Sequence, residues 1–309
     1  MKTLRGAVFG AGVMGAYHAR MLRQAAGVEL VGVVDTDADK RAQVAGALGC
    51  GGFADIVEAL DAGLDFAVVA TPNHLHAPLT EQLLTNGVHV LVEKPIANTP
   101  EEARRLIAAA DVAGRLLMVG HVERFNPAVL AAKAACEGER VVSVSITRAG
   151  PFPPRMADVG VIMDLAVHDV DIVRYITGSD IAEVSCQHDR VHGSRQDVAL
   201  ILARTESGAS AQIDCNWLTP FRVRQMKIAT ATKFIVADLI TRQVVEHSAF
   251  MPNGAYTTRH LFVRQAEPLQ LEHEAFLEAI RNGAPAPVTG WDGLRNLEIA
   301  LSCIGGEAA

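Results

Sequence analysis

A lysine at the end of a predicted strand is the first side chain in this sequence that could do chemistry. The run Glu93-Lys94-Pro95 closes the apolar stretch Val88–Glu93, which has the pattern of a buried strand. The carboxyl ends of parallel strands form the edge at which ligands bind, so Glu93 and Lys94 are expected to contact a bound cofactor. Burial and a positively charged ligand would both favour the neutral amine, which can accept a proton or polarise an oxygen. The alternative is a solvated lysine in a strand-terminal loop.

An aspartate and a histidine four residues apart form a second candidate pair. Asp164 and His168 fall on a predicted helix, Met163–Ile176, whose spacing puts them on one face, and Asp171 lies nearby. An imidazole can take a hydroxyl proton at neutral pH, and a carboxylate beside it would orient the ring and stabilise its charged form. The same pair could instead be an ordinary surface interaction worth about a few tenths of a kcal/mol.

A glycine-rich turn near the N-terminus is typical of dinucleotide binding. The run Gly10-Ala11-Gly12-Val13-Met14-Gly15 leaves the predicted strand Gly6–Gly10 and opens the predicted helix Val13–Ala25. The first glycine permits a tight turn, the second lets the backbone approach a pyrophosphate, and the third lets helix and strand pack closely. The expected cofactor contacts are Gly10, Gly12, Val13, Met14 and Gly15.

Asp35 narrows the identity of the dinucleotide. It follows Gly15 by 20 residues and ends the next predicted strand, Glu29–Asp35. A carboxylate there can accept hydrogen bonds from the adenosine ribose and would repel a 2′-phosphate, so NAD is favoured over NADP, and also over FAD. In the alternative interpretation the glycines only permit packing and Asp35 caps the helix that begins near Ala38.

A further polar loop, Thr71-Pro72-Asn73-His74-Leu75-His76, follows the predicted strand Asp65–Ala70. Its place at the same sheet edge makes Thr71, Asn73 and His76 candidate cofactor contacts through the ribose or the carboxamide. Alternatively, Thr71 or Asn73 caps the helix predicted over His74–Thr85.

No metal site is expected. His188 and His192 lie on or beside a predicted strand, and neither the histidines nor the cysteines have the spacing of a zinc site. Arg222 and Arg224 alternate on one strand face, where they could bind an anion or face solvent or another subunit. Solvent or a subunit is the favoured interpretation.

The order of predicted elements indicates an α/β chain with two domains. Short apolar runs alternate with amphipathic helices through about residue 120, which predicts a doubly wound parallel sheet in a domain of residues 1–120. Residues 121–309 are predicted to form an α+β domain with an open, mostly antiparallel sheet. Its predicted elements are strands at Val141–Arg148, Ile181–Arg190, Asp197–Arg204, Ala209–Trp217 and Arg222–Thr230, and terminal helices at Pro268–Asn282 and Trp291–Cys303.

Composition excludes several classes of partner. The formal net charge is −7, which argues against a surface that binds nucleic acid or an anionic membrane. No window is apolar enough to span a membrane, and the N-terminus shows no signal-peptide pattern. The five cysteines are scattered and odd in number, which fits reduced thiols in the cytoplasm.

Taken together, Gly10–Gly15, Glu93-Lys94-Pro95 and the Asp164 and His168 pair resemble the Gfo/Idh/MocA family of oxidoreductases along nearly the whole chain. The resemblance implies that Lys94 and His168 flank the reacting carbon, with Asp164 beside them as a third catalytic residue. It also implies that the Lys94-Pro95 bond can be cis and that the open sheet forms a homodimer or homotetramer interface.

Longer strings resemble one subgroup of that family, which oxidises UDP-N-acetylglucosamine at C3. They are Gly120–Ala128, Gly150–Arg155 and Asn216–Pro220. On this resemblance Arg124, Asn126, Arg155 and His168 are candidate substrate contacts, although the arginines and the asparagine could instead join the two domains.

The predicted reaction moves a hydride from a sugar ring carbon to NAD, and C3 of a UDP-2-acetamido sugar is the favoured carbon. His168 takes the hydroxyl proton, Lys94 polarises the same oxygen or shares the proton, and Asp164 tunes both. One rival keeps the chemistry with another sugar or an inositol, in either direction. A second rival is an NAD-sensing regulator without catalysis, against which the presence of Lys94 and His168 argues.

Overall fold

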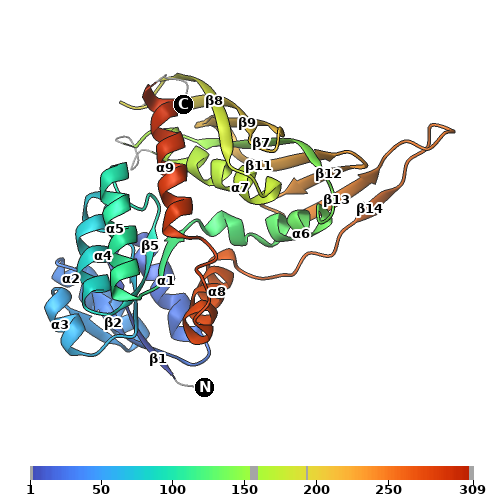
Figure 1. Cartoon of the computed structure of the whole chain (residues 1–309). Coiled ribbons are helices and arrows are strands. Elements are labelled where there is room, and N and C mark those ends of the chain that lie inside the picture. The colour runs from blue at the N-terminus through green and yellow to red at the C-terminus, as the bar shows by residue number, and fades with distance from the viewer. Residues whose placement is uncertain (1–2, 154–158, 193, 306–309) are drawn as a thin grey trace. The chain divides into compact units, whose positions relative to one another are not determined.

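Short apolar runs separated by helices build a parallel sheet in the first part of the chain (Figure 1). The computed structural model describes residues 3–153, 159–192 and 194–305. Its first sheet has the order β3-β2-β1-β4-β5-β6, and every neighbouring pair is parallel. The strands are β1 (Leu4–Phe9), β2 (Val28–Val34), β3 (Gly51–Phe53), β4 (Phe66–Val69), β5 (His89–Glu93) and β6 (Leu117–Gly120). The predicted doubly wound sheet is confirmed, with the short edge strand β3 in addition.

Helices cover both faces of this sheet. Because the chain runs outward from β1 in two directions, right-handed crossovers put α1 and α2 on one face and α4 and α5 on the other. The side chains of Asp37, Asp55 and Thr99 accept hydrogen bonds from first-turn amides of α2, α3 and α5, which fixes where these helices begin. The helices are α1 (Val13–Gln24), α2 (Ala38–Leu48), α3 (Ile56–Asp61), η1 (Asn73–Leu75), α4 (His76–Thr85) and α5 (Pro100–Ala113).

The chain divides into two compact units, and a C-terminal segment returns to the first of them. Met1–His121 and Leu269–Leu297 form one unit, and Val122–Pro268 and Glu298–Ala309 form the other. Phe276 of α8 (Pro268–Asn282) packs edge-on against Phe66 of β4, with ring centroids 5.9 Å apart. The domain expected over residues 121–309 therefore differs from the structure, because the apolar face of α8 completes the core of the first sheet.

The second unit is built on a larger sheet of order β14-β13-β12-β11-β7-β10-β9-β8. The pair β7 and β10 is parallel, and the other neighbours are antiparallel, as the predicted open sheet requires. The strands are β7 (Val141–Pro151), β8 (Ile181–Asp189), β9 (Val198–Thr205), β10 (Ser210–Asn216), β11 (Leu218–Thr230), β12 (Lys233–Asp238), β13 (Gln243–Ser248) and β14 (Thr258–His260). The last three were not expected from the sequence.

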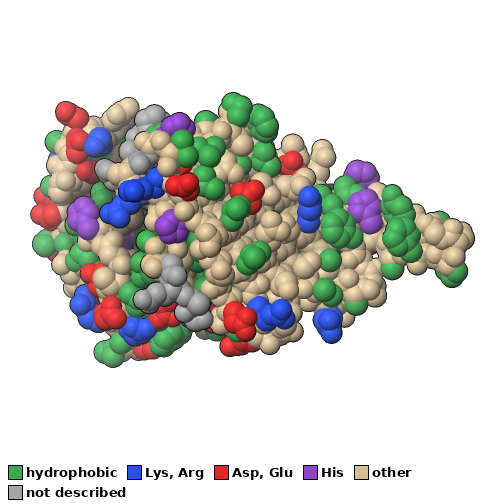
Figure 2. All heavy atoms as spheres, turned by 90° about the horizontal axis from the view of Figure 1, so that it is seen from above, with side chains coloured by type: hydrophobic (Ala, Val, Ile, Leu, Met, Phe, Trp, Pro, Cys, Tyr) green, Lys and Arg blue, Asp and Glu red, His purple; other side chains and the backbone are tan. Residues whose placement is uncertain are grey.

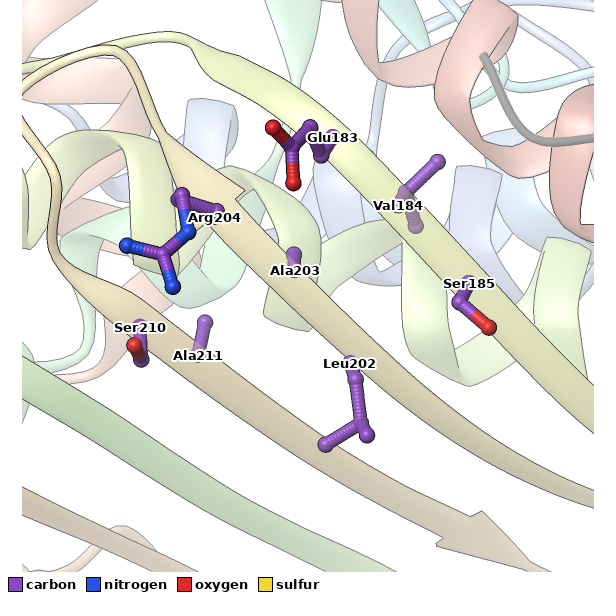
Figure 3. Close-up of a pocket in the computed structure, with 8 residues that line it drawn as sticks. All are labelled: Glu183, Val184, Ser185, Leu202, Ala203, Arg204, Ser210 and Ala211. Carbon is purple, nitrogen blue, oxygen red and sulfur yellow. The ribbon is translucent and has the colours of Figure 1, made fainter.

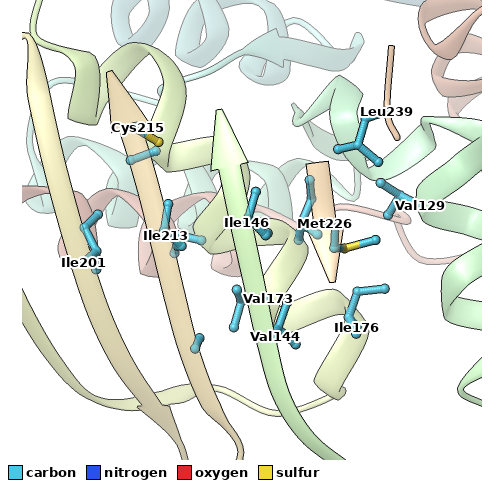
Figure 4. Packing of buried hydrophobic residues seen from close by; sticks show 14 of the residues in the cluster. Val129, Val144, Ile146, Val173, Ile176, Ile201, Ile213, Cys215, Met226 and Leu239 are labelled. Carbon is cyan, nitrogen blue, oxygen red and sulfur yellow. The ribbon is translucent and has the colours of Figure 1, made fainter. Parts of the chain in front are cut away.

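One face of the larger sheet carries the core of the second unit (Figure 4). Ile146 of β7 and Ile213 of β10 point into it and are 1% exposed each. Helix side chains such as Val173 and Ile176 cover them, together with the end of α9 (Gly290–Gly305). The covering helices are η2 (Val122–Phe125), α6 (Pro127–Ala135), the π-helix η4 (Ile162–Ala166) and α7 (Val167–Thr177).

The opposite face of the sheet lies open. Along β9, Ala199 and Ile201 are buried whereas Leu200 and Leu202 are 49% and 62% exposed, as alternation across a strand requires. Figure 2 shows hydrophobic side chains scattered over a surface on which charged ones are sparse. Within the described residues, no helix is both long enough and apolar enough to cross a membrane.

Candidate functional site

The turn from β1 to α1 has the geometry expected of a pyrophosphate cradle. Gly10 has φ +102°, and a Cβ at this position would meet the Ala70 carbonyl oxygen at 2.4 Å. A Cβ on Gly15 would meet the Gly10 carbonyl oxygen at 1.8 Å, whereas one on Gly12 would meet no described atom within 4 Å. The first and third glycines thus serve packing, and the second leaves the helix N-terminus open to a ligand. Val13 and Met14 at the helix start are 58% and 41% exposed.

Asp35 is held at the carboxyl end of β2 with its side chain beside this turn. Its two carboxylate oxygens accept hydrogen bonds from the backbone N–H groups of Ala11 (2.7 Å) and Asp37 (2.9 Å). The N-cap of α2 is Asp37 rather than Asp35. The capping alternative is therefore wrong, and a half-buried carboxylate with lone pairs to spare remains beside the glycine turn.

The loop after β4 offers two polar side chains that cap nothing. The caps of η1 and α4 are Pro72 and Leu75, and neither makes a side-chain cap hydrogen bond. The Thr71 hydroxyl is buried without a hydrogen-bond partner among the described residues. Because an unpartnered buried hydroxyl is costly, Thr71 is suited to a ligand that supplies the bond. Asn73 begins η1 and is half-buried, and its contact with the cofactor stays a prediction.

His76 does not present a ring nitrogen to a ligand in this structure. The residue is 1% exposed, with Nδ1 2.7 Å from the Pro95 carbonyl oxygen and Nε2 2.9 Å from that of Thr71. Carbonyl oxygens only accept, so both contacts are hydrogen bonds together when the ring carries both protons. The expected cofactor contact is replaced by a structural role, in which His76 ties the loop after β4 to the loop after β5.

The carboxylate of Glu93 faces the interior rather than the cofactor edge. It accepts a hydrogen bond from the Lys94 backbone N–H (3.1 Å) and lies 2.9 Å from Nε2 of His18 on α1. Burial opposes its ionisation, but the hydrogen bond and charge of His18, with the charges of Lys94 and His76, hold the pKa of Glu93 below its usual value. Glu93 thus fixes the backbone that carries Lys94, and the Lys94-Pro95 bond is cis, as the resemblance implied.

His168 stands at a change of helix type. The predicted α-helix over Met163–Ile176 begins as the π-helix η4, which contains Asp164, and continues as α7 from Val167. The π-turn closes i→i+5 hydrogen bonds, and the shared face of Asp164 and His168 stays a prediction. Such π-turns are frequent at functional sites.

A buried charge anchors α7 directly after His168. Asp169, which is 0% exposed, accepts hydrogen bonds from Arg148 Nε to both its oxygens at 2.9 and 3.0 Å. Arg148 also donates to Glu123 (3.0 Å), and Arg224 donates to the same Glu123 oxygen (2.8 Å). Burial opposes ionisation of Glu123, but the charges of Arg148 and Arg224 lower its pKa. Arg224 therefore joins this cluster at its edge, with 35% of its side chain still exposed.

Two of the expected substrate contacts have structural partners within the second unit. Arg124 is 8% exposed and pairs with Asp171 through Nε at 2.9 Å and Nη2 at 2.5 Å. Asn126 caps α6 through Oδ1, and its Nδ2 donates to the Leu239 carbonyl oxygen (3.0 Å). Arg155 lies outside the described residues.

Two buried histidines were missed by the sequence analysis. His18 on α1 is 0% exposed, and His273 on α8 is 2% exposed. Both occupy positions in the apolar periodicity of their helices, His18 between Gly15 and Leu22 and His273 between Leu269 and Phe276. A histidine on an apolar helix face is the signal that could have found them.

One hollow lies on the sheet of the second unit, and no predicted site residue lines it (Figure 3). It has a volume of about 540 Å³ and is formed by β8, β9 and β10, with Glu183 and Arg204 at its rim. Among residues 3–153, 159–192 and 194–305, no group of three His, Cys, Asp or Glu side chains is arranged to hold a metal ion.

Replacing Gly12 by Ala should weaken NAD binding without unfolding the protein. The added methyl meets no described atom within 4 Å, so it would fill the space into which the pyrophosphate must come. We expect Kd for NAD to rise at least about tenfold, measured by titration calorimetry, with an unchanged thermal unfolding midpoint. Gly15→Ala is the matched control and should lower that midpoint, because its methyl collides with the Gly10 carbonyl. If Gly12→Ala binds NAD with the wild-type Kd, the turn from β1 to α1 does not hold the pyrophosphate.

Replacing Asp35 by Asn should relax the preference for NAD. The amide keeps an acceptor for the Ala11 N–H and removes the charge that repels a 2′-phosphate. We expect the ratio of Kd for NADP to Kd for NAD to fall by about tenfold, or about 1.4 kcal/mol. Asp37→Ala removes the cap of α2 and should lower stability while leaving that ratio unchanged. If Asp35→Asn leaves the ratio of Kd for NADP to Kd for NAD unchanged, Asp35 does not set the preference for NAD.

Comparison with known proteins places both parts of the chain in one family. Residues 4–121 match the model of an oxidoreductase family with an NAD-binding Rossmann fold, Gfo/Idh/MocA. Residues 138–233 match the Gfo/Idh/MocA C-terminal domain.

Individual relatives cover nearly the whole chain. UDP-N-acetylglucosamine 3-dehydrogenase of Acidithiobacillus ferrooxidans is 32% identical over 302 residues, which are 96% of this chain and 95% of that protein. The NAD-dependent scyllo-inositol 2-dehydrogenase of Bacillus subtilis is 30% identical over 322 residues, 97% of this chain and 92% of that one. A solved structure of the Acidithiobacillus enzyme superposes with a TM-score of 0.92 at 28% identity, covering 99% and 98% of the two chains. The chain therefore belongs to the Gfo/Idh/MocA family and is an NAD-dependent dehydrogenase of the kind that oxidises hydroxyl groups of sugars and polyols.

Proposed function

We propose that this chain oxidises the C3 hydroxyl of UDP-N-acetylglucosamine, or of a related UDP-2-acetamido sugar, to the 3-keto sugar. The observation that carries the proposal is the similarity to the Acidithiobacillus 3-dehydrogenase, at 32% identity over 96% of the chain and a TM-score of 0.92. NAD accepts the hydride, and the cytoplasm, which keeps scattered cysteines reduced, is the proposed place of action.

The proposed catalytic roles follow the chemistry of the side chains. His168 takes the proton of the hydroxyl that is oxidised, and Lys94 polarises the same oxygen or shares the proton. Asp164 adjusts the charge around them. Two features support these roles: Lys94 is fixed at the carboxyl end of β5 by Glu93, and His168 is fixed on α7 by the neighbouring Asp169.

Fewer side chains are proposed to contact the substrate than the sequence suggested. Asn126 and Arg124 have internal partners, so their role in recognition is to hold the α6 and α7 region in shape. Arg155 is the proposed contact for the anionic diphosphate, since guanidinium groups bind phosphate oxygens in pairs. Arg155→Ala should raise KM for a UDP-sugar and leave KM for an uncharged polyol unchanged.

Oxidation of an inositol is the second candidate function. The scyllo-inositol 2-dehydrogenase of Bacillus subtilis is 30% identical, close to the value for the sugar-nucleotide enzyme. The chemistry at the reacting carbon is the same. The two candidate functions differ in which protein groups must bind the rest of the substrate.

A substrate screen decides between these candidates. The purified protein is mixed with NAD and one of UDP-N-acetylglucosamine, UDP-N-acetylgalactosamine, scyllo-inositol, myo-inositol or free N-acetylglucosamine, and NADH is followed at its absorbance band. The proposal predicts that kcat/KM is highest for a UDP-2-acetamido sugar. A higher value for an inositol would support the second candidate instead. NAD binding with no NADH from any of the five would favour a regulator without catalysis.

Replacing Lys94 by Met or His168 by Gln should remove catalysis and spare cofactor binding. Loss of a proton acceptor or of oxygen polarisation costs about 10²- to 10⁴-fold in kcat. Steady-state kinetics with the best substrate from the screen measures that loss, and quenching of protein fluorescence by NAD checks that Kd stays within about twofold. A variant with near-normal kcat is not catalytic at that position.

We also propose that the open face of the larger sheet pairs with a second copy of the chain. Leu200, Leu202 and Phe234 alternate with buried residues of β9 and β12 and expose 42–62% of their surface there. An apolar surface of this kind is uncommon on a monomer and is typical of an interface.

Leu202→Glu should therefore shift the protein toward monomer in sedimentation-velocity runs, because it buries a charge in the proposed interface. Val112→Glu is the control, since Val112 lies on α5 of the other unit and is 91% exposed. Identical sedimentation of the wild type and Leu202→Glu would contradict the interface.

A further inference from the structure

Two cysteines that are far apart in the sequence lie together in the second unit. Cys186 is on β8, the strand at one edge of the larger sheet, and Cys303 is in the last turn of α9. Both are free thiols. None of the roles given above to Lys94, His168 or Asp164 uses either sulfur.

The side chain of Cys186 faces the core of the second unit. Side chains alternate along a strand, so Cys186 shares a face of β8 with Val184, which is 5% exposed. Its partner across the ladder is Ile201 of β9, which is 1% exposed. Cys186 accordingly packs against the hydrophobic core cluster. Because β8 is an edge strand, the residue is nevertheless only half-buried, and solvent molecules can reach its sulfur.

The side chain of Cys303 belongs to that same core cluster. Helical spacing puts Ile299, Ala300 and Cys303 on one face of α9, and they are 0%, 0% and 2% exposed. The chain from Glu298 onward is part of the second unit. Both cysteines therefore lie within one compact unit, on the covered side of its sheet.

The two thiols contact each other. The Cys303 thiol donates a hydrogen bond to the Cys186 sulfur, which lowers the pKa of Cys186 although burial opposes its ionisation. The same hydrogen bond, with burial, raises the pKa of Cys303. Cys186 is thus the thiol that ionises more readily, and Cys303 is a protonated thiol beside it.

The other three cysteines lack this arrangement. Burial raises the pKa of Cys50, Cys136 and Cys215, and no second cysteine contributes to any of these shifts. Among the five cysteines, all of which the structure describes, Cys186 alone combines a partly exposed sulfur, a lowered pKa and a neighbouring thiol. Cysteines that respond to oxidants typically have these three properties.

We propose that Cys186 and Cys303 are a site of reversible oxidation, at which hydrogen peroxide closes a disulfide bond between β8 and the last turn of α9. The thiols are reduced at rest, and the disulfide bond forms when peroxide is present. The bond fastens the end of α9 to the edge of the larger sheet. This modification site is independent of which substrate the enzyme oxidises.

The two steps of the oxidation balance. The Cys186 thiolate attacks one oxygen of hydrogen peroxide, the O–O bond breaks, and a sulfenic acid forms on Cys186 while hydroxide leaves and takes a proton from solvent. The Cys303 sulfur then attacks the Cys186 sulfur, and the Cys303 thiol proton leaves with the sulfenic hydroxyl as a second water. The two sulfurs lose two electrons in total and one peroxide is reduced to two waters. A dithiol reductant reverses the bond.

Peptide mapping of the folded protein tests the site. The reduced full-length chain is treated with hydrogen peroxide without denaturant, the remaining thiols are alkylated, and the digest is examined by mass spectrometry. We expect a linked pair of peptides that contain Cys186 and Cys303, a thiol count that falls by two, and full recovery with dithiothreitol. Cys50→Ser is the matched control, because Cys50 is also half-buried but has no neighbouring thiol, and it should give the same linked pair.

Two variants separate the roles of the two thiols. Cys186→Ser should leave Cys303 reduced, because Cys303 is 2% exposed. Cys303→Ala should let a sulfenic acid accumulate on Cys186, where dimedone traps it, and then pass to the sulfinic acid. Peroxide should also raise the thermal unfolding midpoint of the wild type by at least about 4 °C, and leave that of Cys186→Ser unchanged.

Several results overturn the site. They are a wild type in which peroxide leaves Cys186 and Cys303 unlinked, a linked pair that forms only after denaturant is added, and a bond from Cys186 to a second copy of the chain. A bond that forms without raising the unfolding midpoint contradicts the fastening of α9. If Cys303→Ala does not fold, the peptide map of the wild type still decides. None of these measurements uses NAD or a sugar, so the disulfide site and the proposed substrate fail separately.

Discussion

The buried carboxylate of Glu93 is the constraint on which the organisation of the first unit depends. A carboxylate out of water must be met by donors or by a countercharge, since a lone buried charge costs several kcal/mol. The Lys94 N–H meets it from one side and His18 of α1 from the other, with His273 of α8 behind. One desolvated group thereby ties a strand and two helices to the loop that carries Lys94.

In the second unit, a buried carboxylate next to His168 is likewise met by donors. Asp169 follows His168 directly, is fully buried, and is held by Arg148, which also holds Glu123. Buried ion pairs contribute little net stability, but they fix geometry because any other arrangement leaves a charge unpaired. In both units the proposed proton-handling side chain is the neighbour in sequence of a buried carboxylate, and that neighbour sets its position.

The sequence predicted those features that depend on local physical rules. Glycines at Gly10 and Gly15 are required by contacts of their own turn, and apolar runs of four to seven residues marked the parallel strands. Features that depend on distant contacts were missed. His76 was expected to bind the cofactor. Nothing in its own segment shows that its Nδ1 lies against the carbonyl oxygen of Pro95.

Longer-range features were missed for the same reason. The return of α8 to the first sheet follows from contacts more than 200 residues apart, such as Phe276 with Phe66. The π-turn before His168 was hidden by a pattern that is equally good for an α-helix. Strands β12 to β14 were also missed. β14 is exposed throughout and β13 buries only Val244, so neither has a clear strand pattern, whereas β12 does alternate, with Ile235 and Ala237 buried.

The central claim is that this chain moves a hydride from a ring carbon of a sugar nucleotide to NAD. UDP-N-acetylglucosamine with deuterium at C3 tests it most directly, with the product cofactor examined by NMR. The account predicts that the deuterium appears on C4 of the nicotinamide ring, in a single stereochemical position. Unlabelled NADH, or NADH formed only from an inositol deuterated at its reacting carbon, would contradict it.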